Sequence, residues 1–381
     1  MKKEEEKFQP VKLSSGTIGF NGFNRLKKTL FLLIISMLFL SGCALKIGTS
    51  ISNNSGFYFS SDKGKQWVQK TELMNIGEGR AFFKNSKPTF LKVDPQDSQA
   101  LYVGTMEDGI IYSFNKGKSW QKTLTGKGVI HDLAIDSKDK CTIYVAAGNG
   151  VYKTQDCMRH WDNIHIEGLP KQSIKAVAVD GYNNNKVYIG TSGGGLFKSL
   201  DYGVSWESIK WFNTTINKIL INSQNTAKVY VATNKKGIYK SNNEGIDWYN
   251  ISDKITYRDK DGKEKKYEEV NNYLDLEFDF SQEDALIYAN PYGLFYTEDG
   301  GENWDSIKLL TKPKAVTIRC VALNPNNNKE IYYSTSSTVY KSIDSGREWS
   351  TEKLPSSRTP IDLMVDVENG NNLFMIFREI K

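Results

Sequence analysis

Acidic or amide side chains hold one fixed position in seven copies of a short phrase within this 381-residue chain. The phrase is Ser/Thr-x-Asp/Asn-x-Gly-x-x-Trp, and its third position is Asp62, Asn115, Asp156, Asp201, Asn243, Asp299 and Asp344. A carboxylate placed this way could act as a general acid, or it could accept hydrogen bonds from the backbone of its own turn. Two copies carry Asn, which keeps the acceptor and loses the charge. The pattern therefore predicts a structural role for this position.

The glycine and tryptophan of the phrase have separate roles. Gly supplies the positive φ that a tight loop requires. Trp begins the next strand and is expected to bury a large ring between neighbouring sheets. The seven closing tryptophans are Trp67, Trp120, Trp161, Trp206, Trp248, Trp304 and Trp349. In the third copy Met158 replaces the glycine, so we expect that loop to differ from the other six.

Three further carboxylates, Asp132, Asp275 and Asp362, occupy equivalent positions within apolar segments. Paired carboxylates could serve glycoside hydrolysis. The alternative, which we favour, is that they bond to backbone donors where a strand begins. The three histidines lack the spacing of metal ligands, so we expect neither a metal nor a cofactor.

The segments between the phrases predict the elements that position these side chains. Each phrase follows a strand such as GVYKT, which follows a strand such as IYVAA, which follows an apolar strand ending in Asp or Asn, such as LAID. Four short strands in a repeat of about 45 residues are typical of a propeller blade. The sequence therefore predicts an all-β chain that forms a seven-bladed β-propeller with four-stranded blades.

The two ends of the repeat region are expected to complete one blade together. The repeats begin with a third and a fourth strand from Gly56, and they end with a first strand from Ile361 and a second strand from Asn371. Pairing them would remove the open edge of the ring. Residues 45–50, LKIGTS, could compete for the place of the second strand.

The N-terminal residues predict export. Arg25, Lys27 and Lys28 precede an apolar run over residues 29–40, which is followed by Ser41-Gly42-Cys43. This arrangement is typical of a secretory signal, and the run is too short to span a bilayer. Leu40-Ser41-Gly42-Cys43 resembles a bacterial lipobox, which implies acylation at Cys43. An uncleaved signal anchor is the alternative.

The chain is therefore expected to have three parts and to work in the bacterial cell envelope. Residues 1–42 would be a cytoplasmic n-region and lipoprotein signal peptide, 43–55 the lipidated N-terminus and linker, and 56–381 the propeller. The lipid would anchor the protein on the extracytoplasmic side of the membrane. Residues 43–381 hold 43 Lys or Arg against 41 Asp or Glu. This near balance does not favour a nucleic-acid partner.

Cysteine placement agrees with an oxidising compartment. Cys141 opens the second strand of one blade, and Cys157 lies in the phrase after the third strand of the same blade. Antiparallel pairing brings these positions together, so we expect a disulfide. Reduced thiols are the alternative. Cys320 lies within a first strand and is expected to be buried and unpaired.

Propeller geometry places all seven phrases on one face and the connections between blades on the other. Two long insertions, at about 71–88 and 252–272, fall in those connections, and the second reads as a two-stranded flap around Asp261-Gly262. Six cationic candidates map to the same face. They are Arg80, His131, Lys175, Arg258, Arg319 and Arg358. They predict a site for a carboxylate, a phosphate or an acidic protein surface. The alternative is that they pair with Asp259, Glu268 or Glu269.

The seven phrases resemble the Asp-box (BNR) repeats of sialidases, sortilin-type receptors and photosystem II assembly/stability factor-like lipoproteins. The resemblance covers about residues 45–378. One seven-bladed ring behind a lipobox is most similar to the last group, while the Phe-Arg-Ile-Pro segment of sialidases does not occur in this sequence. The resemblance implies a non-catalytic scaffold or assembly and quality-control factor that binds a membrane or envelope protein. A secreted glycoside hydrolase with a glycan ligand is the alternative.

Overall fold

The computed structural model describes residues 54–74, 81–168 and 171–380. The described residues all belong to one compact unit, Ile51–Lys381. Four sequence-based expectations fall outside the described residues: the signal peptide at 1–42, the lipidated Cys43, the competing strand at 45–50, and Arg80.

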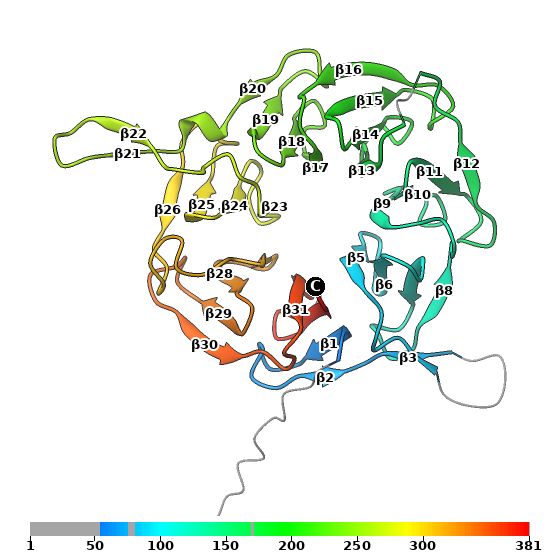
Figure 1. Ribbon diagram of the computed structural model, residues 1–381, viewed down its shortest axis with the longest axis horizontal. Coiled ribbons are helices and arrows are strands. Elements are labelled where there is room, and N and C mark those ends of the chain that lie inside the picture. Colours follow the sequence, from blue (N-terminus) through cyan, green and yellow to red (C-terminus); the bar gives the residue numbers. More distant parts are fainter. Residues whose placement is uncertain (1–53, 75–80, 169–170, 381) are drawn as a thin grey trace, which may run out of the picture. The chain divides into compact units, whose positions relative to one another are not determined.

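Seven four-stranded antiparallel sheets form a ring of blades around a central opening (Figure 1). Blade 1 comprises β5 (Pro88–Asp94), β6 (Asp97–Thr105), β7 (Ile110–Ser113) and β8 (Gln121–Thr123). Blade 2 comprises β9 (Ile130–Ile135), β10 (Ile143–Ala147), β11 (Gly150–Thr154) and β12 (Asp162–Ile164). Blade 3 comprises β13 (Ile174–Val179), β14 (Val187–Thr191), β15 (Gly195–Ser199) and β16 (Glu207–Trp211).

The later blades repeat this order from the channel outwards. Blade 4 comprises β17 (Ile216–Ile221), β18 (Val229–Thr233), β19 (Gly237–Ser241) and β20 (Tyr249–Asn250). Blade 5 comprises β23 (Asp275–Phe278), β24 (Leu286–Asn290), β25 (Gly293–Thr297) and β26 (Asp305–Ile307). Blade 6 comprises β27 (Cys320–Asn324), β28 (Asn327–Ser334), β29 (Thr338–Ser342) and β30 (Ser350–Lys353). The prediction of a seven-bladed propeller is confirmed.

Blade 7 closes the ring from both ends of the propeller. Its strands are β31 (Thr359–Val365), β32 (Leu373–Arg378), β1 (Gly56–Ser60) and β2 (Val68–Gln69). β1 pairs with β32 in a register that runs from Gly56 opposite Phe377 to Ser60 opposite Leu373. The C-terminal segment thus supplies the second strand, as the sequence predicted, and hydrogen bonds close the seam.

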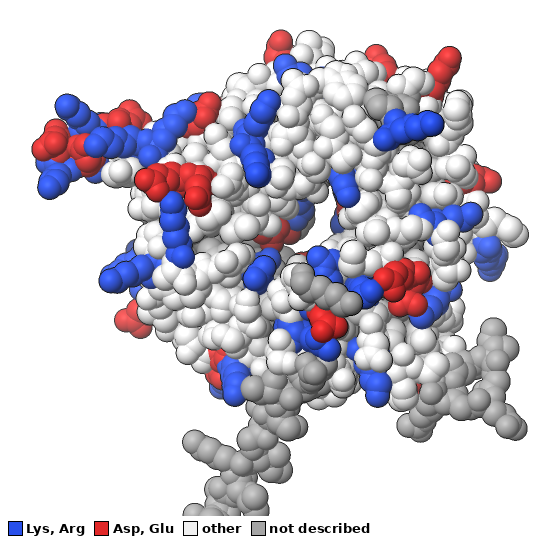
Figure 2. All heavy atoms as spheres, in the orientation of Figure 1, with Lys and Arg blue, Asp and Glu red and all other residues white. Residues whose placement is uncertain are grey.

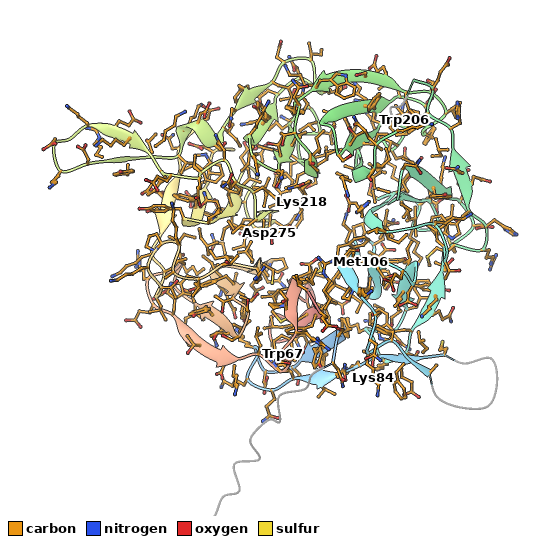
Figure 3. The ribbon with its side chains drawn as sticks, in the orientation of Figure 1. Trp67, Lys84, Met106, Trp206, Lys218 and Asp275 are labelled. Atoms are coloured by element: carbon orange, nitrogen blue, oxygen red, sulfur yellow. A yellow bond between two sulfur atoms is a disulfide. The ribbon has the colours of Figure 1, made fainter. Side chains whose placement is uncertain are left out.

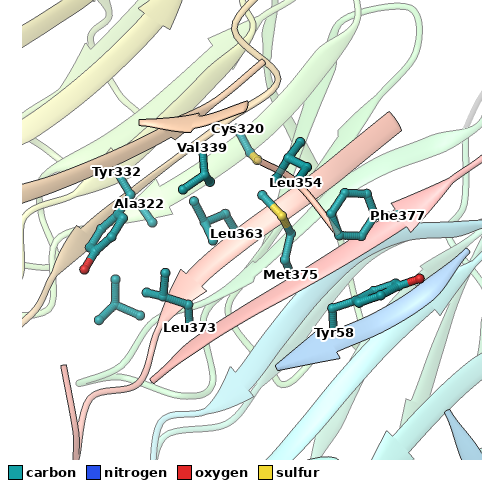
Figure 4. Packing of buried hydrophobic residues seen from close by; sticks show 11 residues of the cluster. Tyr58, Cys320, Ala322, Tyr332, Val339, Leu354, Leu363, Leu373, Met375 and Phe377 are labelled. Carbon is teal, nitrogen blue, oxygen red and sulfur yellow. The ribbon is translucent and has the colours of Figure 1, made fainter. Parts of the chain in front are cut away.

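The cores lie between neighbouring blades. The second strands are buried on both sides and read as continuous apolar runs, as in the fully buried β14 and β18. Figure 4 shows one such core, where Tyr332 and Val339 of blade 6 pack with Leu373 and Met375 of blade 7. Each large apolar side chain buried in this way contributes about 1.5–3 kcal/mol to folding.

All seven Asp-boxes form the same hydrogen-bonded loop. In the first box, Ser60 Oγ accepts a bond from the backbone N–H of Gly64 (2.9 Å) and donates to Asp62 Oδ1 (2.8 Å). Asp62 Oδ1 also accepts from the N–H of Gln66 at 2.9 Å. Asn115 of the second box accepts through Oδ1 in the same way, from Ser119 N–H at 2.9 Å. The amide therefore replaces the carboxylate without changing the loop.

The third box corrects one expectation. Met158 has φ +69°, and its N–H bonds to Thr154 Oγ1 at 3.0 Å, as the glycines of the other boxes do with their Ser or Thr. The expectation that this loop differs was wrong. A non-glycine residue in the left-handed region costs about 1–2 kcal/mol. Met158 is buried against the core of blades 1 and 2, and it follows the disulfide-bonded Cys157, so packing and the cross-link both hold the loop.

The two insertions extend from connections between blades. In the second, a 3-10 turn η1 (Ser252–Lys254) precedes the paired strands β21 (Thr256–Arg258) and β22 (Glu264–Lys266). The predicted two-stranded flap is confirmed, and it projects from the ring in Figure 1. In the first, β3 (Glu72–Leu73) pairs with β4 (Ala81–Phe82). Among the described residues, no helix has the length and apolar character to cross a membrane.

Candidate functional site

Three carboxylates in the first strands join neighbouring blades. Asp132 accepts from the N–H of Leu133 at 2.9 Å and from the N–H of Val177 in blade 3 at 3.0 Å. Asp275 and Asp362 make the same two kinds of bond, one within their own strand and one to the next blade. The acceptor distances are 2.9 Å to Leu276 and 3.1 Å to Val321 for Asp275, and 2.9 Å to both Leu363 and Leu91 for Asp362. These carboxylates therefore satisfy backbone donors, which is the reading that the sequence favoured.

Ionised side chains surround this level of the channel. Lys218 of β17 bonds to Glu277 and lies 3.6 Å from Asp275, and Figure 3 shows Lys218 and Asp275 at the central opening, away from Trp67 and Trp206. Burial opposes the charge on Lys218, but the two carboxylates outweigh it and raise the lysine pKa well above its usual range. Burial, together with the charge of nearby Asp275, raises the pKa of Asp362 to about 7.

His131 and Lys175 meet at the channel mouth on the face opposite the boxes. The ammonium of Lys175 donates to Nε2 of His131 across 3.1 Å. Burial lowers the pKa of both side chains, and for His131 the charge of Lys175 adds to this and brings the pKa to about 4. The imidazole is therefore neutral near pH 7, and Lys175 keeps two donor hydrogens for another partner.

The three described arginine candidates have different surroundings. Arg319, half-buried, donates from Nε to Ser336 Oγ at 3.3 Å. Arg258 is exposed on β21 of the flap. Arg358 forms an ion pair with Glu379 at 2.5 Å, so its charge is already partly neutralised.

The acids that were expected to neutralise these arginines have other partners. Asp259 pairs with Lys265 at 2.8 Å. Glu268 and Glu269 lie 2.7 and 3.7 Å from the ammonium of Lys314. Within the described part of the chain, none of the ion pairs involves Arg258, Arg319 or Lys175. The alternative, that the cationic candidates pair with Asp259, Glu268 or Glu269, therefore does not hold for these three.

The face that carries these cations is positively charged as a whole. We define the opposite face by the connections between blades and by the turns between second and third strands. Its ranges are 70–88, 105–109, 123–130, 148–150, 165–174, 191–195, 212–216, 233–237, 251–274, 290–293, 308–319, 335–338, 354–359 and 378–380. Their described residues include 19 Lys or Arg against 11 Asp or Glu. On the flap itself, basic and acidic side chains are intermixed (Figure 2).

The cysteines occupy two kinds of site. Cys141 and Cys157 are joined by a disulfide that links the turn before β10 to the third box. Cys320 is buried and free, with its Sγ 2.9 Å from Ser334 Oγ. Among the described residues, no group of three or more His, Cys, Asp or Glu side chains is placed to hold a metal ion.

The closing tryptophans differ in burial, which the sequence pattern did not reveal. Trp120 is fully buried, while the other six are only partly buried. Trp67, Trp206 and Trp248 donate from Nε1 to the glycine carbonyl of their own box at 2.9–3.0 Å. Trp120 donates instead to the carbonyl of Lys70, and it is fully buried because Leu73 and Phe83 of the first insertion pack against it. The length of that insertion could have indicated that Trp120 is more buried than the other box tryptophans.

Comparison with known proteins finds both assembly factors and glycoside hydrolases. A family model described as "Photosynthesis system II assembly factor YCF48" matches residues 256–356. A "probable oligoxyloglucan-reducing end-specific xyloglucanase" of Neosartorya fischeri is 26% identical over 188 residues, which are 43% of this chain and 22% of the relative. The chain thus spans about a fifth of the length of that relative.

Solved structures share the fold at low identity. A GH74 enzyme from Niastella koreensis superposes with a TM-score of 0.62 at 15% identity, covering 81% of this chain and 53% of the enzyme. YCF48 from Cyanidioschyzon merolae gives 0.56 at 11% identity, covering 81% and 98%. YCF48 bound to a D1 peptide gives 0.56 at 11% identity, covering 78% and 94%. At such identities the likeness shows the fold alone. The chain is an Asp-box β-propeller that resembles YCF48-type assembly factors.

Proposed function

We propose that this protein is a non-catalytic, membrane-tethered propeller that binds an acidic segment of a protein partner through the opposite face. One observation carries the proposal: Lys175 and Arg319 lie at the channel mouth with donors to spare, Arg319 within and Lys175 directly beside a face that holds 19 cations against 11 acids. Guanidinium and ammonium groups placed in this way suit carboxylates. The flap and the first insertion lie on the same face and would extend the contact.

The carboxylates that could have performed hydrolysis are engaged elsewhere. Asp132, Asp275 and Asp362 each accept backbone bonds from two blades, and the box acids accept bonds from their own loops. A general acid must be free to reach the bond that it cleaves. This supports a scaffold or assembly role of the kind that YCF48 has, and a structure of YCF48 with a D1 peptide makes a peptide segment a reasonable ligand here.

The tether follows from the N-terminal residues. β1 runs from Gly56 toward its box at Ser60, so the chain enters blade 7 from the opposite face. A lipid on Cys43 would tether the propeller to the extracytoplasmic membrane surface, where a membrane or envelope protein is the natural partner. Fatty-acid labelling of cells checks this step, because the Cys43→Ala variant should lose the label that the unaltered protein acquires.

A glycoside hydrolase is the second candidate. It is favoured by the similarity to a xyloglucanase and by Asp362, whose pKa of about 7 would suit a general acid. Incubation with xyloglucan oligosaccharides decides this candidate. Release of product by the protein, abolished in Asp362→Asn, would establish the hydrolase and contradict the non-catalytic proposal.

Binding experiments with the full chain test the main proposal. The probe is a Glu-rich peptide, and the variants are Arg319→Ala, Lys175→Ala and a deletion of residues 256–268. Loss of a charge partner at the desolvated channel mouth should weaken binding by about tenfold or more, and more than loss of Arg258 on the flap. Arg347→Ala is the matched control, because this exposed arginine lies in a box. If all three variants keep the fold and bind the peptide as tightly as the unaltered protein does, the proposal is contradicted.

A further inference from the structure

The box face carries the opposite charge to the face that we propose for acidic partners. We define it by the seven boxes and the seven turns between first and second strands. The ranges are 60–66, 94–100, 113–119, 136–142, 154–160, 180–186, 199–205, 222–228, 241–247, 279–285, 297–303, 324–330, 342–348 and 366–372. They hold 21 Asp or Glu against 11 Lys or Arg. Several of these cations are already paired, such as Lys116 with Asp366 and Lys186 with Glu244. The net charge of this face is therefore strongly negative.

One blade also exposes a cluster of large apolar side chains on this face. In blade 3 they are Tyr182 (71% exposed), Leu200 (51%), Tyr202 (46%) and Val204 (79%). The turn and the box that carry them are bonded together, since Tyr202 N–H donates to the carbonyl of Asn185 at 2.9 Å and the Asn185 amide donates to the carbonyl of Leu200 at 2.7 Å. These four residues form the blade 3 patch.

Comparison of the seven boxes shows whether the loop itself requires the apolar side chains of this patch. Leu200, Tyr202 and Val204 occupy the first three of the four variable positions of the fourth box, and no other box is apolar at all three. The first box has Ser61, Lys63 and Lys65 there and forms the same loop. The loop therefore does not require apolar side chains, and burial within the ring does not explain them because they remain exposed.

Fixed acidic groups surround the patch. Asp201 lies within it, bonded to Ser199 and Ser205 of its own loop at 2.7 and 2.6 Å. Asp247 belongs to the box of neighbouring blade 4, which also exposes Ile246. Two cations also lie at its edge: Lys138 is 5.5 Å from the Tyr182 ring, and Lys153 is 5.7 Å from the Tyr202 ring and donates to the carbonyl of Tyr202. The patch thus combines exposed apolar area with ionised acids.

We propose that the blade 3 patch is a second docking surface, which binds a basic amphipathic segment of a partner protein. Apolar side chains of the segment would cover Leu200 and Val204, while its lysines or arginines would face the acids of the box face. This surface is separate from the proposed acidic-partner site, which lies at the other end of the strands. The propeller could therefore hold two segments of opposite charge at once.

The test uses the full chain and a synthetic peptide of Lys, Leu and Phe, with a counterpart in which Glu replaces Lys. The variant is Leu200→Gln/Val204→Gln, because the third box holds Gln155 at the position of Leu200 and keeps the loop. Ile343→Gln is the matched control, since Ile343 is exposed at the same box position in blade 6. Thermal unfolding establishes that each variant retains the fold.

We expect the unaltered protein to bind the basic peptide, with binding weakened by added salt. The double variant should bind about tenfold more weakly or worse, while Ile343→Gln and Arg319→Ala should not differ from the unaltered protein. The proposal is overturned by absence of binding, by equal binding of the Glu peptide, or by unchanged affinity of the double variant. Self-association that the double variant abolishes would overturn it too, because the patch would then serve a second copy.

Discussion

The two faces of the propeller differ in what is repeated. On the box face, seven loops share one hydrogen-bond pattern despite differences in sequence, including Asn at the third position and Met in place of Gly. On the opposite face, the connections range from the short turn 148–150 to the long insertion 251–274. The repeated residues build the ring, and we propose that the residues that depart from the repeat are the ones that bind partners. The following experiments test that division.

The largest effect is expected from the buried tryptophan. Trp120→Ala should lower the free energy of unfolding by about 3–5 kcal/mol, since the ring is fully buried and contacts Phe57 and Phe83. Trp206→Ala should cost less, because that ring is only partly buried. Urea unfolding measures both. Should Trp206→Ala retain full stability and lose only binding of the acidic or the basic peptide, the box tryptophans would belong to a binding site instead.

Loss of the disulfide should have the next largest effect. Replacing Cys141 and Cys157 by Ser opens a loop of 16 residues and should cost about 3 kcal/mol. Cys320→Ser should also lower the free energy of unfolding, because it replaces a buried thiol. The loss of the disulfide should therefore cost only modestly more than Cys320→Ser. Non-reducing peptide mapping of the purified protein checks the bond itself. Two free thiols at Cys141 and Cys157 would contradict it.

Asp362 should make stability depend on pH. Its pKa is raised from 3.8 to about 7 in the folded protein, so its favourable contribution is complete below pH 3.8 and is lost as pH rises through 7. The unaltered protein should therefore lose roughly 1–3 kcal/mol between pH 5 and 8 relative to Asp362→Asn. Urea unfolding at both pH values measures the difference. Parallel profiles for the two proteins would show that this carboxyl does not titrate in that window.

The smallest effect is expected at a box carboxylate. Asp201→Asn should change stability by less than about 1 kcal/mol, because Asn115 and Asn243 already accept the same backbone bonds in other boxes. Asp201→Ala should cost more, since the N–H of Ser205 then loses its acceptor. A large loss of stability in Asp201→Asn would show that the charge itself is needed to hold the loop.

The sequence predicted the features of the fold that depend on the spacing of the repeat and on its turn residues. The blade order, the closure of blade 7 and the flap around Gly262 follow from spacing and turn residues, and all are confirmed. The sequence could not predict which side chains pair across the ring, because these pairs join residues far apart in the chain. The pairing of Glu268 with Lys314 and the bond between Lys175 and His131 are examples. The conformation of Met158 was misjudged because packing and a cross-link outweigh its backbone preference.

The acidic charge of the box face could have been counted from the sequence, since the loops were already assigned to faces. The blade 3 patch also lay within reach, because alignment of the boxes isolates Leu200, Tyr202 and Val204. What the alignment could not supply was their exposure, which distinguishes a surface cluster from core residues.

The central claim is that the two faces bind segments of opposite charge independently. The most direct measurement is the affinity of the acidic and basic peptides for two variants, Lys175→Ala/Arg319→Ala and Leu200→Gln/Val204→Gln. We expect the first variant to lose affinity for the acidic peptide only, and the second variant to lose affinity for the basic peptide only. Loss of both peptides in either variant, or of neither peptide in both, would contradict the claim.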